Sequence, residues 1–117
     1  MFDSKNLLYI LTMLEAIEKI FIYSADFENE EKFYLANKQL NFNASVNLLI
    51  AIGEENKKID EELKTSNKIN WKNLSAMRDK VSHNYRGIDE SMVWEIIKDY
   101  LPTLKILLIE MLPKIEN

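Results

Sequence analysis

Residues 7–21 read LLYILTMLEAIEKIF, and apolar side chains recur there every three or four positions. Helix positions with this spacing share a face, so the stretch predicts a long amphipathic α-helix. Asp3 or Ser4 stands just before it as a candidate N-cap. The predicted apolar stripe consists of Leu7, Ile10, Leu11, Leu14, Ile17 and Phe21. A helix of this kind must bury its stripe against other elements.

Similar spacing predicts two further helices in the first half of the chain. A short one is expected from about residue 29 to residue 40, and a longer one carries apolar positions from 44 to 63. Asn41 and Asn43 either mark a break between the two or form a polar patch on one long kinked helix. Gly53 lies inside the longer stretch, where glycine costs about 1 kcal/mol relative to alanine. Close approach of a neighbouring helix is one structural reason for a glycine there.

The second half predicts a loop and two more helices. Residues 65–68 form the loop, and the helical pattern resumes near Trp71 and runs to a stop at Gly87. Asp89 or Ser91 caps a final helix to about residue 111, in which Pro102 is expected to cause a kink or an interruption. This last helix is apolar on more than one face, as in a central helix or one shared between subunits. We predict an all-α fold, an antiparallel bundle of four main helices plus a short one, homodimeric, with one domain spanning residues 1–117.

Composition excludes several classes of protein. Two glycines and two prolines in 117 residues are too few for the tight turns of a strand-rich fold. The absence of cysteine and the single histidine exclude disulfides, thiolate zinc sites, cysteine nucleophiles and a histidine-rich metal site within one chain. The most apolar early stretch, residues 7–23, contains Glu15, Glu18 and Lys19, which a membrane-spanning helix would not tolerate cheaply. We expect a cytoplasmic protein with no membrane partner, no metal and no cofactor.

Basic residues concentrate in one segment. The chain has a net charge of −4, yet residues 64–86 contain six lysines and arginines against one acid, Asp79. Both arginines, Arg78 and Arg86, lie within five residues of His83, the single histidine. The segment is either a lysine-rich solvated face or an anion site, in which the planar fork of arginine would bind phosphate. Because the whole chain is acidic, any nucleic-acid binding must be local.

The stretch 77–86, MRDKVSHNYR, brings the unusual residues together. Arg78 and Tyr85 are seven positions apart and fall on nearly one helical stripe, whereas His83 lies about 140° around the helix from Arg78. Arg78 and His83 therefore converge only if the turn distorts or a second copy completes the site. A lone histidine is usually a partly buried residue bonded to a neighbour, and a lone tyrosine is usually a rim aromatic. Their coincidence with both arginines in the basic segment favours a functional site.

These residue types suit RNA cleavage. Histidine serves as a general base or a general acid near neutral pH, and arginine offers paired donors to a phosphate whose negative charge grows in the transition state. One histidine per chain cannot act as base and acid at the same time. A two-fold dimer supplies two histidines.

The spacing Arg78, four residues, His83, one residue, Tyr85 resembles the R-x4-H-x-Y motif of HepT-like toxins in the HEPN ribonuclease superfamily. Flanking features resemble the family too, and the likeness runs from the first helix to about residue 108. They are the triplet Ile52-Gly53-Glu54, Trp71 before the motif, and Val93-Trp94 followed by Leu101-Pro102. Two positions depart from the common pattern: Glu55 stands where relatives often have a small residue, and Asp79 where asparagine is frequent.

The resemblance implies a metal-independent ribonuclease that acts as the toxin of a type VII-like toxin–antitoxin pair. Its active cleft would form where two subunits meet, with Arg78 and His83 as catalytic residues and Asp79 in support. The implied antitoxin is a cognate minimal nucleotidyltransferase that attaches AMP to Tyr85. RNA is the expected substrate, with tRNA as one candidate, and toxin and antitoxin could assemble further. We assign contacts with the RNA backbone to Lys80 and Arg86.

Two other functions compete with the ribonuclease. One is a non-catalytic helical subunit that presents substrate to a nucleotidyltransferase, but such relatives generally lack the full motif. The other is a plain helical interaction module whose basic loop binds an acidic partner. The complete R-x4-H-x-Y spacing favours the enzyme.

Overall fold

The computed structural model describes residues 4–83 and 89–116, and all regular elements in these ranges are helical. The longer helices are α1 (Ser4–Ser24), α3 (Leu40–Asn56), α5 (Trp71–His83) and α7 (Leu101–Glu116). Shorter ones are α2 (Glu30–Leu35), α4 (Glu61–Lys64) and α6 (Glu90–Glu95), with η1 (Ala36–Gln39) and the π-helical turn η2 (Ile96–Tyr100). The predicted all-α bundle is confirmed. None of the described helices is long and apolar enough to cross a membrane.

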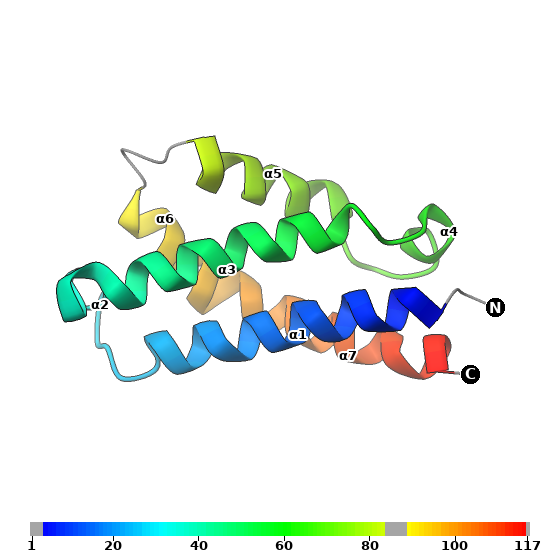
Figure 1. Cartoon of the computed structure of the whole chain (residues 1–117), viewed down its shortest axis with the longest axis horizontal. Coiled ribbons are helices and arrows are strands. Elements are labelled where there is room, and N and C mark those ends of the chain that lie inside the picture. The colour runs from blue at the N-terminus through cyan, green and yellow to red at the C-terminus, as the bar shows by residue number, and fades with distance from the viewer. Residues whose placement is uncertain (1–3, 84–88, 117) are drawn as a thin grey trace.

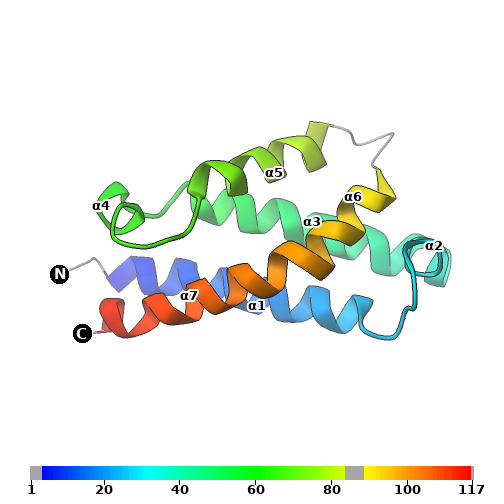
Figure 2. The ribbon, with the colours of Figure 1, turned by 180° about the vertical axis from the view of Figure 1, so that it is seen from behind.

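Helix α1 is central to the bundle. It packs against α3 on one side and α7 on the other, and α3 in turn packs against α5. Figures 1 and 2 show α5 along one edge and α7 along the edge away from it, with the start of α1 beside the end of α7. Helix α6, the turn η2 and α7 follow one another as a nearly continuous rod (Figure 2).

The buried face of α1 differs in part from the predicted stripe. Ile10 and Ile17 are fully buried as predicted, but Leu11 is 44% exposed. The centre of the face instead includes Met13 and Ile20, both fully buried. Two neighbours, α3 and α7, cover α1 from different sides, so its buried face is wider than one stripe and is turned away from Leu11.

The break between the second and third helices lies at residues 36–39, not at Asn41 or Asn43. Asn37, Lys38 and Gln39 all adopt left-handed backbone angles, with φ of 51°, 56° and 70°. Asn41 and Asn43 belong to α3, and the Asn41 amide donates to the carbonyl oxygen of Tyr23 at 3.0 Å. Left-handed angles cost most residues about 1–2 kcal/mol each, and asparagine adopts them more readily than lysine or glutamine.

Helix α3 ends at Asn56, before the predicted extension to residue 63. The buried Asn56 amide donates to Ser75 Oγ at 2.6 Å, which ties this end of α3 to α5. The following turn is held at Asp60, whose carboxylate accepts from the Asn6 amide at 3.0 Å. These side-chain hydrogen bonds to distant elements stabilise the chain where α3 ends, and α4 begins as a separate helix.

The remaining helix boundaries agree largely with the prediction. The loop at 65–68 connects α4 to α5, and the Asp89 carboxylate caps α6 by accepting from the backbone N–H of Ser91 at 2.9 Å. The interruption expected at Pro102 takes the form of the π turn η2, after which the Leu101 N–H bonds the Ile96 carbonyl. Pro102 follows as the second residue of α7, and the irregular turn before it accommodates the missing N–H. Asp3 and Gly87, proposed as helix signals, lie outside the described residues.

Replacing Lys38 by glycine should stabilise the protein. Lys38 is exposed and has left-handed backbone angles, so glycine there removes most of the backbone strain. Part of this gain is lost because glycine has more conformational freedom in the unfolded chain. We expect a gain of about 0.5–1 kcal/mol in the free energy of unfolding, measured by urea denaturation. The matched control is Lys38→Ala, which removes the same side chain but keeps the left-handed cost. Equal stability of the two variants would contradict this strain.

Candidate active site on helix α5

Helices α3 and α5 are in close contact at Gly53. A Cβ placed on Gly53 would overlap Cβ and Cγ of Arg78, so the arginine stem lies directly on the glycine backbone. The close helix approach expected from the glycine is therefore present, and the neighbour is the predicted catalytic arginine. Only glycine leaves room for Arg78 in this position.

The Arg78 guanidinium lies between two carboxylates. Its Nη2 forms an ion pair with Glu54 Oε1, and its Nη1 donates to Asp79 Oδ1 at 3.2 Å. The hydrogen bond with Asp79 and the charge of Glu54 raise the pKa of Arg78 further, although partial desolvation opposes them. Arg78 therefore stays charged at every working pH, and its side chain is 24% exposed. Both Nη atoms are paired with carboxylates and Nε is buried, so a ligand that takes both Nη donors must displace a carboxylate.

The two carboxylates differ in how easily a ligand could displace them. Asp79 is more exposed than Glu54, and it neighbours Arg78 on the same helix. Glu54 comes from α3, next to the glycine on which Arg78 rests. An incoming phosphate can replace the exposed Asp79 contact while Glu54 keeps the guanidinium oriented. Glu54 therefore orients the arginine, and Asp79 forms a contact that a ligand can replace.

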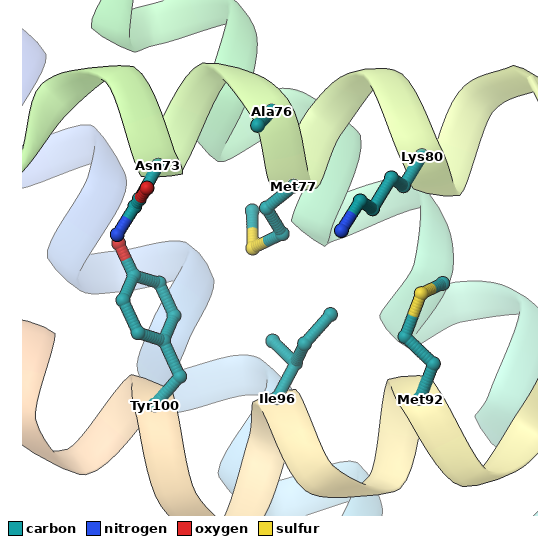
Figure 3. A pocket seen from close by; sticks show the side chains of 7 residues that line it. All are labelled: Asn73, Ala76, Met77, Lys80, Met92, Ile96 and Tyr100. Carbon is teal, nitrogen blue, oxygen red and sulfur yellow. The ribbon is translucent and has the colours of Figure 1, made fainter.

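The other predicted site residues are placed only in part. His83 is the last residue of α5, and Tyr85 and Arg86 lie outside the described residues. Lys80 does not join Arg78, because two residues correspond to about 200° around a helix. It lines a cavity between α5 and the α6–η2 segment instead (Figure 3).

Sequence reasoning missed most of the residues of this cavity. Asn73 and Met77 come from α5, and Met92 and Tyr100 come from the α6–η2 segment. The sequence gives little indication of these residues, because the i, i+4 and i+7 spacing of Asn73, Met77 and Lys80 is that of any amphipathic helix face. Glu54 belongs to the triplet Ile52-Gly53-Glu54 that resembles the family, but the sequence assigns it no role. Within residues 4–83 and 89–116, no cluster of three or more acidic or histidine side chains is arranged to hold a metal ion.

Comparison with known proteins identifies the family. The family model "Ribonuclease HepT-like" matches residues 13–111, which include the whole R-x4-H-x-Y segment. The chain belongs to the HepT-like ribonuclease family. The family resemblance seen in the sequence is therefore confirmed.

Curated relatives carry ribonuclease names. "Probable ribonuclease HepT" of Thermococcus cleftensis is 34% identical over 98 residues, covering 83% of this chain and 86% of that protein. "Putative RNase MJ1216" of Methanocaldococcus jannaschii is 36% identical over 104 residues, covering 88% and 82%. In a third relative, "Gamma-glutamylcyclotransferase and putative RNase MJ0434" of the same archaeon, the matching part is 43% of the protein, at 34% identity. No solved structure gives a significant match.

Replacing Gly53 by alanine should separate α3 from α5. The new methyl group would occupy the space of the Arg78 stem, so one helix or the arginine must shift. We expect the free energy of unfolding to fall by about 1–3 kcal/mol, measured by urea denaturation. Asn47→Ala introduces the same residue on the exposed side of α3 and should stay within about 0.5 kcal/mol of the parent. Similar behaviour of the two variants would refute the close packing at Gly53.

Proposed function

We propose that this protein is a ribonuclease toxin that cleaves RNA without a metal ion, using Arg78 and His83 from two subunits. The observation that carries the proposal is the fixed, permanently charged Arg78 on the helix that ends at His83. Membership of a ribonuclease family and the ribonuclease names of its relatives support it.

The proposed reaction uses the hydroxyl group of the RNA as nucleophile. One histidine takes the proton of the 2′-hydroxyl as its oxygen bonds to phosphorus. The bond from phosphorus to the 5′-oxygen breaks, and the second histidine gives that oxygen a proton. The products are a 2′,3′-cyclic phosphate and a 5′-hydroxyl. Arg78 donates to the phosphate oxygens, whose negative charge grows in the transition state.

A homodimer follows from this chemistry, because each chain has one histidine and the reaction needs two. The sequence favours a dimer partly because the last helix is apolar on more than one face. Ile106 and Ile109 of α7 are exposed, but a contact through them would not lie at the cleft. Helix α7 lies along the edge of the bundle away from α5 (Figures 1 and 2). We therefore place the subunit contact that forms the cleft near α5. A higher toxin–antitoxin assembly stays a prediction.

Changing either catalytic group should slow cleavage severely. Arg78→Lys keeps the charge but loses the paired donors, and we expect a rate loss of about 10²–10³-fold. His83→Ala should lose about 10²–10⁴-fold. The measurement is cleavage of a tRNA pool in excess EDTA, with Lys19→Ala as the control, since Lys19 is an exposed lysine on α1, outside the basic segment.

Three results would contradict this mechanism. They are full activity of either variant, cleavage at a 2′-deoxyribose, and loss of activity in EDTA that magnesium restores. Light scattering of the same preparations tests the cleft, because an active monomer is incompatible with a site built from two subunits.

We further propose that a minimal nucleotidyltransferase silences the toxin by attaching AMP to Tyr85, two positions after His83. The added phosphodiester would repel RNA and pair with nearby arginine, so binding of the substrate is blocked. Tyr85→Phe keeps the ring and loses the acceptor oxygen.

We expect the Tyr85→Phe toxin to inhibit growth even when the nucleotidyltransferase encoded beside it is co-expressed. Tyr34→Phe, a change on α2, should still be neutralised. Mass spectrometry should find adenylyl mass on the peptide that contains Tyr85. A silenced toxin with unmodified Tyr85 would mean that neutralisation works by complex formation.

A further inference from the structure

A cavity of ≈ 250 Å³ separates α5 from the α6–η2 segment (Figure 3). It faces away from the contact between Arg78 and α3, so it is distinct from the arginine site. Six residues that line it matter here: Asn73, Met77 and Lys80 from α5, and Met92, Ile96 and Tyr100 from the opposite wall. Its size is that of a space for one small ring system.

The middle of the cavity is apolar and adaptable. Met77 and Ile96 face each other across it, and Met92 lies farther along the same wall as Ile96 (Figure 3). Methionine is flexible and polarisable, and its sulfur makes favourable contacts with aromatic rings. Ile96 and Tyr100 belong to the π-helical turn η2, an irregularity that occurs often at functional sites. These walls suit the faces of a flat ring.

Polar groups occupy the two ends of the cavity. At one end, the Asn73 amide and the Tyr100 hydroxyl point toward one another, and at the other end Lys80 extends its ammonium inward (Figure 3). The Asn73 amide both donates and accepts hydrogen bonds, as the edge of a nucleobase does. Burial raises the pKa of Tyr100, so its phenol stays neutral and can donate at ordinary pH. Lys80 supplies a positive charge for a phosphate.

We propose that this cavity binds the nucleobase of a nucleotide adjacent to the scissile bond. The proposal rests on the proposed ribonuclease function and makes Tyr100 and Asn73 specificity residues of that same enzyme. Tyr100 would stack on the base, Asn73 would bond its edge, and Lys80 would contact its phosphate. Apolar walls with polar groups at both ends match a base that carries a phosphate.

The distance to the catalytic motif is compatible with one nucleotide. Each residue of a helix adds about 1.5 Å along its axis, so Lys80 lies about 4.5 Å and Met77 about 9 Å before His83. Along the helix axis, the cavity therefore begins within one nucleotide of the end of α5, where His83 stands.

Methionine methyl NMR of the full chain tests binding in the cavity without relying on cleavage. Met77 and Met92 report on the cavity, and the buried Met13 and Met111 serve as internal references. We expect nucleoside 5′-monophosphates to shift the signals of Met77 and Met92, and ribose 5-phosphate to leave them in place. Tyr100→Leu should weaken the binding about tenfold or more, because stacking on the ring is lost. Tyr9→Leu, which alters a half-buried tyrosine of α1, should not.

Some NMR results would overturn the proposal. They include the absence of shifts at millimolar nucleotide and equal shifts with ribose 5-phosphate. Another is that the two signals move only with protein concentration, which would mean that a second copy of the chain fills the cavity.

Cleavage provides the second arm of the test. An RNA with an abasic nucleotide on one side of the cut should be cleaved about tenfold or more slowly by the parent enzyme. Tyr100→Leu should cleave the abasic and the intact RNA at the same rate. If the parent enzyme cleaves an RNA with an abasic nucleotide on either side of the cut as fast as the intact RNA, the base subsite is wrong although the enzyme is active. If neither RNA is cleaved, the ribonuclease proposal fails, and the NMR titration still decides whether the cavity binds a nucleobase.

Discussion

The contact of Arg78 with Gly53 is the constraint on which the site depends. Because residue 53 has no side chain, the arginine stem can lie on the backbone of α3, and the next residue, Glu54, meets the guanidinium. A partly exposed ion pair contributes little stability by itself. The packing of α3 against α5 therefore sets the position of Arg78, and the carboxylates only orient its charged end. The polar site is a consequence of how two apolar helix faces meet.

Much of the fold follows from local patterns, whereas the details that differ come from distant contacts. The apolar spacing of residues 7–21 predicted α1, but the rotation that exposes Leu11 results from two helices covering α1 at once. The end of α3 at Asn56 depends on a bond to Ser75, nineteen residues away. The left-handed turn at 37–39 contains no glycine, so the strongest sequence signal for such a turn is missing, although Asn37 tolerates these angles. Local periodicity cannot report such tertiary effects.

The candidate site divides in a similar way. The motif spacing led to Arg78, His83 and Tyr85 and to the family, because the motif is short and continuous. The surroundings of Arg78 could only be partly foreseen, since Glu54 approaches it from another helix. The sequence does not show that neighbouring basic residues of segment 64–86 can face different ways. Lys80 and Arg78 are two residues apart but lie on different sides of α5, so they serve different parts of the molecule.

The π turn η2 determines which face of the last helix, α7, is turned toward α1. A residue added to one turn offsets everything after it by about 100° relative to a regular α-helix. Before the turn, Trp94 packs on Phe33 of α2 with ring centroids 5.6 Å apart, whereas after it α7 faces α1. One nearly continuous rod thereby serves two different neighbours. The number of residues in this turn should consequently be under stronger selection than their identity, since losing one would misalign every later side chain with α1.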